Sequence, residues 1–232
     1  MMDTIDLTAN RQPVEDMLSR PLPLCLAKPK WLGSDCDHFV IFTEPPKAPG
    51  LSEVLPRLRK GVKRARKADR KSERYSALAG HGLQRKHGTM SACVQEEDGS
   101  WSQGFQYRLI ACSHDIDPIG YCTFGISLDY ENGCVVAVNE IWAEPAWRGN
   151  GVGSAFAQVV ATIVLSTLEE FDMRLAGTLP HAVSIPILIE GDVYSISGKD
   201  FLDAIQFAMY DFANDVSWMT YAGLEIEVDA RW

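Results

Sequence analysis

The sequence lacks the cysteine patterns that hold a metal or build a disulfide scaffold. None of its six cysteines belongs to a CxxC pair, and its five histidines do not cluster with them. A zinc site needs closely spaced ligands, and a small secreted scaffold is denser in cysteine than this chain of 232 residues. We therefore expect no metal site and reduced, mostly buried thiols. The cysteines are Cys25, Cys36, Cys93, Cys112, Cys122 and Cys134.

The sequence also lacks a long apolar run. The longest, from Val159 to Leu165, is far shorter than the roughly 20 residues that cross a bilayer. The opening MMDTIDLTAN has two acidic residues and no apolar core, unlike a signal peptide. These features predict a soluble, cytoplasmic protein without a membrane partner.

Acidic residues are scarce in one stretch, residues 57–86, which holds 12 of the 22 lysines and arginines but only Asp69 and Glu73. Its charge of about +10, subtracted from the net charge of −9, leaves about −19 for the rest of the chain. Three roles remain open for this basic stretch. It could be a face solvated or neutralised within the molecule, a dock for nucleic acid or the ribosome, or a binding surface for an acidic protein or a phosphate group. Aromatic residues are too few here to favour stacking on single strands.

Residues 1–89 are interpreted as an N-terminal extension. Four prolines within residues 1–35 predict irregular structure, followed by a short strand over 37–43. The composition then predicts a basic helix over about 51–77 and a loop over 80–88.

Residues 90–232 are interpreted as the main domain. Strand-like stretches are expected at 90–95, 106–113, 120–128 and 134–143, with Asn132-Gly133 as a hairpin signal. Apolar residues at three- and four-residue spacing from Val152 to Phe171 predict a helix packed on a sheet. One or two strands over 182–197, broken at Gly191-Asp192, a helix over about 200–218 and a strand over 224–228 complete the pattern. This order predicts a mixed α+β fold with a largely antiparallel sheet.

The most informative segment joins the strand that ends at Ala143 to that helix. Glycines alternate in Arg148-Gly-Asn-Gly-Val-Gly-Ser154, so backbone N–H groups can converge on an anion at the helix N-terminus. A dinucleotide-binding fingerprint would need glycine in place of Ser154, and a Walker loop would need a lysine that is absent. A pyrophosphate in another type of ligand is therefore the expected guest.

This segment resembles the signature of the GCN5-related N-acetyltransferase superfamily, which reads Arg/Gln-x-x-Gly-x-Gly/Ala. Arg148, Gly151 and Gly153 match it, preceded by Trp147 and Pro145. The resemblance covers roughly residues 90–230. It implies an acyl-coenzyme A N-acyltransferase fold, in which the strand before the motif splays from its parallel neighbour and helices flank the sheet.

The resemblance also implies where acetyl-coenzyme A would bind. The pantetheine arm would lie against Ile141, Trp142 and Ala143. The pyrophosphate would be held by the loop residues Arg148, Gly149, Asn150, Gly151, Val152, Gly153 and Ser154.

Two side chains are candidates for proton transfer. A protonated amine must lose a proton before it attacks a thioester. In the superfamily a glutamate on the strand before the motif often removes it, and Glu140 has that place. Tyr210, in Ala208-Met-Tyr-Asp-Phe212, is the candidate acid for the departing thiolate, with Tyr194 and Tyr221 as alternatives. Core or solvated structural roles for Glu140 and Tyr210 stay open.

The sequence thus predicts an acetyltransferase that moves an acetyl group from acetyl-coenzyme A to a primary amine by direct attack in a ternary complex. The acidic majority of the chain favours a cationic acceptor, such as a polyamine, an aminoglycoside or a protein amine. The rival hypothesis is a non-catalytic acyl-coenzyme A sensor or adaptor whose basic helix binds nucleic acid or a protein. The oligomeric state is open, with a dimer among the possibilities.

Overall fold

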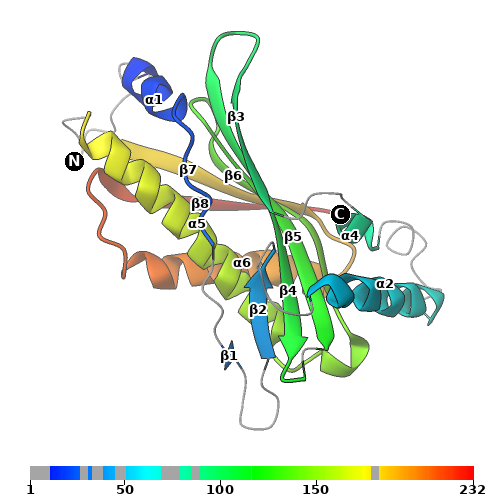
Figure 1. Cartoon of the computed structure of the whole chain (residues 1–232). Coiled ribbons are helices and arrows are strands. Elements are labelled where there is room, and N and C mark those ends of the chain that lie inside the picture. The colour runs from blue at the N-terminus through cyan, green and yellow to red at the C-terminus, as the bar shows by residue number, and fades with distance from the viewer. Residues whose placement is uncertain are drawn as a thin grey trace.

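The structure, a computed structural model, describes residues 11–26, 31–32, 39–44, 51–68, 79–84, 89–115, 117–178 and 183–232. Its elements (Figure 1) are, in chain order, α1 (Arg11–Leu18), β1 (Trp31–Leu32), β2 (Phe39–Thr43), α2 (Leu51–Ala68), α4 (His81–Gln84), β3 (Met90–Gln95), β4 (Trp101–Ser113), β5 (Pro118–Asp129), β6 (Gly133–Ala143), the 3-10 helix η2 (Pro145–Trp147), α5 (Val152–Ala176), β7 (Val183–Asp192), α6 (Ile196–Ala213) and β8 (Tyr221–Arg231).

The described strands form one sheet of eight, in the order β1-β2-β4-β5-β6-β7-β8, with β3 paired to β4. Neighbours up to β6 are antiparallel, whereas β6–β7 and β7–β8 are parallel. The predicted α+β class with a mostly antiparallel sheet is therefore confirmed. The Asn132-Gly133 turn between β5 and β6 is confirmed as well, with φ of 72° at Gly133.

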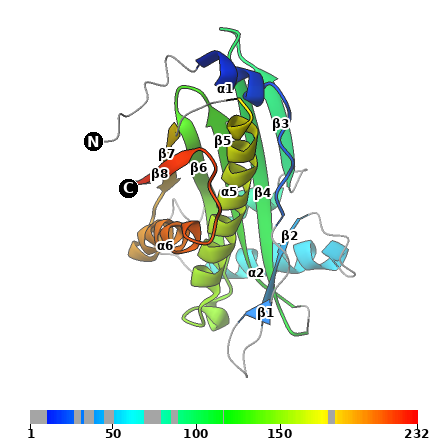
Figure 2. The ribbon, with the colours of Figure 1, turned by 90° about the vertical axis from the view of Figure 1, so that its left-hand side faces the viewer.

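Helices cover both faces of the sheet. Figure 2 shows α5 and α6 on one face and α2 on the opposite one. On the α5 face, Phe156, Val160 and Val164 belong to the main core, whereas Leu58 of α2 joins a second core on the other face. By length and composition α5 could span a membrane, but 61% of its most apolar window is buried inside the protein. It is the central core helix of this domain.

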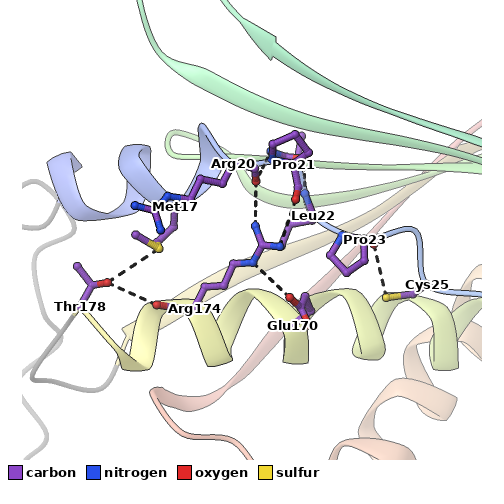
Figure 3. A network of polar contacts seen from close by, with 10 residues as sticks. Met17, Arg20, Pro21, Leu22, Pro23, Cys25, Glu170, Arg174 and Thr178 are labelled. Carbon is purple, nitrogen blue, oxygen red and sulfur yellow. Dashed lines mark hydrogen bonds and ion pairs between the residues drawn. The ribbon is translucent and has the colours of Figure 1, made fainter.

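The expectation of irregular structure in residues 1–35 is wrong for α1. Val14, Met17 and Leu18 recur at three- and four-residue spacing and are buried in the main core, which stabilises a helix too short to persist alone. Figure 3 shows how the chain that follows α1 is fixed to α5. Arg174 donates to the carbonyl oxygens of Arg20 (2.9 Å) and Pro21 (3.2 Å).

Several expected boundaries also shift. In the segment 182–197, β7 ends at Asp192, where the break was expected, and residues 193–195 lead into α6 rather than into a second strand. Helix α6 begins at Ile196 rather than near residue 200, since the Ser195 side chain caps it by accepting from the Gly198 N–H, and it ends at Ala213. Part of the expected loop 80–88 is the short helix α4.

The predicted basic helix is described as far as Ala68, and its expected continuation over 69–77 lies outside the described residues. The division of the chain at residue 89 stays a prediction. The described elements before it share the sheet and the cores with the rest, since β2 pairs with β4 over its whole length.

Candidate active site at the end of strand β6

Strand β6 parts from β7 halfway along its length. The parallel ladder ends at the pair Val138 and Gly191, whereas β6 stays paired with β5 as far as Ala143. Asn139 has no partner in β5, and such a bulge bends a strand and increases its twist. One backbone edge of residues 139–143 therefore has no strand partner in the described part of the chain.

The three residues predicted to face pantetheine lie along this free edge. The Trp142 side chain is only 3% exposed and packs with Tyr121 and α2. The side chain of Trp142 is thus closed to a ligand. Ile141 and Ala143 alternate with it, and their half-buried side chains adjoin the α5 core.

The turn after β6 is anchored by Trp147. Its backbone N–H donates to the carbonyl of Glu144 (2.8 Å), and its ring packs edge-on against the Phe39 ring at a centroid distance of 6.3 Å. The Asn150 N–H then donates to the Trp147 carbonyl (3.3 Å). These contacts fix the start of the glycine loop to the sheet.

The loop itself presents bare backbone. Gly149 and Gly151 adopt φ values of 86° and 78°, which side chains of L-residues rarely tolerate. A Cβ placed on either glycine, or on Gly153, would meet nothing within 4 Å, so open space lies over the loop.

The N-terminus of helix α5 faces this open space, because the helix begins within the glycine loop. Its N-cap, Gly151, offers no side-chain acceptor, and its first turn holds no acidic residue. The first N–H groups of a helix have no intrahelical partner, and the helix dipole adds partial positive charge there. Arg148 brings a cation to the same turn, with its Nε donating to the Ala143 carbonyl at 3.2 Å. The loop is thus suited to a diphosphate.

Glu140 is bound by a segment that precedes it by about 60 positions in the sequence. We call residues 79–84 the strap. The N–H groups of Gly80 and Gly82 donate to the two carboxylate oxygens of Glu140, at 2.5 and 3.0 Å. A Cβ on Gly82 would stand 2.7 Å from a Thr123 carbon, so only glycine allows this close approach.

The strap is held from two further directions. Arg108 of β4, which pairs with Glu44, donates to the Gly82 carbonyl at 2.9 Å. From α2, Arg59 donates to the Leu83 carbonyl, through Nη2 at 2.6 Å and Nε at 3.2 Å. No sequence signal predicts these contacts, because they join segments 24 and 26 residues apart whose pairing depends on the fold.

The candidate tyrosines differ in position. Tyr194 lies three residues after Gly191, whose pairing with Val138 is the last one between β7 and β6. Tyr210 is 44% exposed near the end of α6, where Phe212 and Thr162 of α5 line the same pocket. Thr162 lies about 15 Å along α5 from the glycine loop. Burial strongly raises the pKa of Tyr221, with contributions from Cys134 and Asp172. By chain position Tyr194 lies closest to the splayed strands.

The described cysteines are free thiols. Burial raises the pKa of Cys112 to about 11 and that of Cys134 to about 12, and it also raises that of Cys122. A thiol kept protonated is a poor nucleophile. Within the described ranges no group of His, Cys, Asp and Glu side chains could hold a metal ion.

Comparisons with known proteins do not assign a family. No family model matches the chain, and no curated protein does. Among solved structures, nourseothricin acetyltransferase is 19% identical over 34% of this chain, with a TM-score of 0.24. The matched region spans about half of that enzyme, 54% of its length.

An aminoglycoside acetyltransferase from an uncultured soil metagenomic sample is similar in two structures. They are 12% identical (with trehalose) and 11% identical (with sisomicin), and each match covers 72% of this chain and 87% of the other, with a TM-score of 0.33. These structural neighbours are acetyltransferases, but TM-scores this low carry no argument about function, which must rest on the site itself.

Proposed function

We propose that the protein is an N-acetyltransferase that moves an acetyl group from acetyl-coenzyme A to a primary amine. One observation carries this proposal. An uncapped helix N-terminus, opened by two left-handed glycines, adjoins a strand whose backbone edge is free. A diphosphate with an extended, amide-bearing arm matches both features at once.

In this proposal the main chain of residues 149–154 holds the diphosphate, with Arg148 beside it. The pantetheine arm pairs with the free edge of Ile141, Trp142 and Ala143, as an added strand would. The helix dipole and the N–H groups supply the affinity for the anion, and the splay supplies the room for the arm.

The chemistry requires three functions. Glu140 takes the proton of the attacking amine, directly or through water. Each carboxylate oxygen has two acceptor sites, so the two strap bonds leave capacity for this proton. A backbone N–H of the free edge stabilises the tetrahedral oxyanion. A tyrosine protonates the departing thiolate, and its position makes Tyr194 a stronger candidate than Tyr210.

The acceptor in this proposal is cationic. Residues outside 57–86 carry about −19, as derived above. On β8, the side chains of Glu225, Glu227 and Asp229 are all exposed and alternate with apolar ones. A surface of this sign raises the local concentration of cationic amines.

The test uses two matched glycine variants. Gly151 and Gly99 both have positive φ (78° and 87°) and open space at Cβ, but Gly99 lies in the turn between β3 and β4. Gly151→Glu should abolish binding of coenzyme A in calorimetry, because a carboxylate enters the anion site. Gly99→Glu should bind as the unaltered protein does. Equal affinity in both variants would refute the loop as the coenzyme A site.

A non-catalytic acyl-coenzyme A sensor is the second candidate, because the strap occupies both oxygens of Glu140. A panel of amines and basic peptides distinguishes the two functions. Thiol release from acetyl-coenzyme A that rises with one amine supports the enzyme. Binding without release above spontaneous hydrolysis for every amine supports the sensor.

A further inference from the structure

Helix α2 has an inner and an outer side of opposite character. On the inner side Val54, Leu58 and Val62 are buried, and they pack with Tyr121 and Trp142. The helix Leu51–Ala68 also carries seven basic residues and one acidic residue. Its cations are too many for the structural contacts that it makes.

Three of the seven cations have structural contacts. Arg57 pairs with Asp117 at 2.6 Å, while Arg59 and Arg66 donate to strap carbonyls. The other four form what we call the basic stripe, and all four are exposed. No acidic residue in the described part of the chain forms an ion pair with them. The basic stripe comprises Lys60, Lys63, Arg64 and Lys67.

Within the ranges that the structure describes, neutralisation by acidic side chains therefore does not explain the stripe. The chain is acidic overall, at −9, yet its described acids do not pair with these four cations. The spacing of three, four and seven residues puts the side chains on one face of the helix. From Lys60 to Lys67 the stripe extends about 10 Å along the helix axis.

We propose that the basic stripe docks on the phosphate backbone of a double-stranded nucleic acid. A duplex presents one negative charge per about 1.7 Å of axis, so four adjacent cations find partners without a specific sequence. The exposed described residues of α2 other than its cations are Pro56 and Ala68, neither of them a large apolar side chain. Protein interfaces and insertion into lipid both depend on large apolar side chains. Binding of single strands needs aromatic side chains on which the bases stack.

Fluorescence anisotropy with the full chain and a labelled duplex of about 20 base pairs tests the proposal. Four phosphate contacts predict a slope of about −3.6 for log K against log salt, and hence a loss of about 10²-fold between 50 and 200 mM salt. Lys63→Gln/Lys67→Gln should bring the slope to about −1.8. The matched control Lys199→Gln/Arg231→Gln also removes two exposed cations, from α6 and β8, and should keep the original slope.

Four outcomes would overturn the proposal. One is that the unaltered chain shows no binding of the duplex at 50 mM salt that weakens as the salt concentration is raised. Another is an equal loss of binding in both double variants. The third is equal or tighter binding of polyglutamate or of anionic vesicles, which would identify an acidic protein or a membrane. The fourth is tighter binding of a single strand of equal length. Thermal melts of both variants check that each remains folded. None of these results depends on acetyl transfer.

Discussion

Replacing Glu140 by glutamine separates the two roles that this carboxylate has in our interpretation. Glutamine keeps the length of the side chain but exchanges one acceptor oxygen for an NH₂ donor. That donor must then face the N–H of either Gly80 or Gly82, which now donate at 2.5 and 3.0 Å. One charge-assisted bond is lost. The Gly80 N–H would keep only the Tyr121 hydroxyl as an acceptor, at 3.1 Å, whereas the Gly82 N–H would have none. The cost in unfolding free energy should be about 1–2 kcal/mol for this half-buried group.

Two measurements are needed. Urea unfolding gives the change in stability, and turnover at saturating acetyl-coenzyme A between about pH 6 and 9 gives the change in catalysis. Loss of a general base should lower kcat by about 10²- to 10⁴-fold and flatten its pH dependence, with little change in coenzyme A affinity. The control is Glu144→Gln, near the same strand end, whose side chain accepts no hydrogen bond within the described ranges. It should change stability by less than about 0.5 kcal/mol.

The reasoning fails in two distinguishable ways. If Glu140→Gln unfolds at the same urea concentration as the unaltered protein, the carboxylate does not anchor the strap. If the variant is destabilised as expected but keeps both rate and pH dependence, Glu140 is a structural acceptor and not the base.

Two predictions concern stability alone. Buried Asp172 accepts hydrogen bonds from the N–H groups of residues 219–221 at 2.6–3.0 Å. Asp172→Asn should therefore lower the free energy of unfolding in urea by about 2–3 kcal/mol. The control is Asp203→Asn, which removes an exposed ion pair with Lys199 and should leave the urea midpoint nearly unchanged. Burial raises the pKa of Cys134 from 9.0 to about 12, so the fold keeps a proton that the unfolded chain releases. The contribution of Cys134 to stability should be full below pH 9 and fall by about 1.4 kcal/mol per pH unit above it. Unfolding curves from pH 8 to 10.5 should therefore show a fall that is shallower by this amount in Cys134→Ala.

The glycine loop could be predicted from sequence because its determinants are local. Gly149, Gly151 and the periodic apolar residues that follow fix a turn and a helix start within a few positions. The hairpin at Gly133 was predictable for the same reason. Local φ preferences and hydrophobic periods act over the distances that one segment of sequence spans.

The surroundings of Glu140 could not be predicted, because they depend on contacts between distant segments. Gly80 reaches it across 60 positions of the sequence, and neither glycine of the strap belongs to a recognisable motif. The start of α6 was missed for a different reason. Its cap, Ser195, precedes Ile196, whose side chain is 74% exposed, so the first turn lacks the apolar period that marks a helix.

If our proposal holds, the acceptor side and the coenzyme A side at the end of β6 can be altered separately. Glu140 and Trp142 lie on the face covered by the strap and α2, whereas Ile141 and Ala143 lie on the face of α5. The free backbone edge lies between these two faces and belongs to neither. In our proposal coenzyme A uses that edge and the N-terminus of α5, so a substitution beneath α2 should change the acceptor and base chemistry first. A substitution in the glycine loop should instead remove the acetyl donor while the strap stays bound to Glu140.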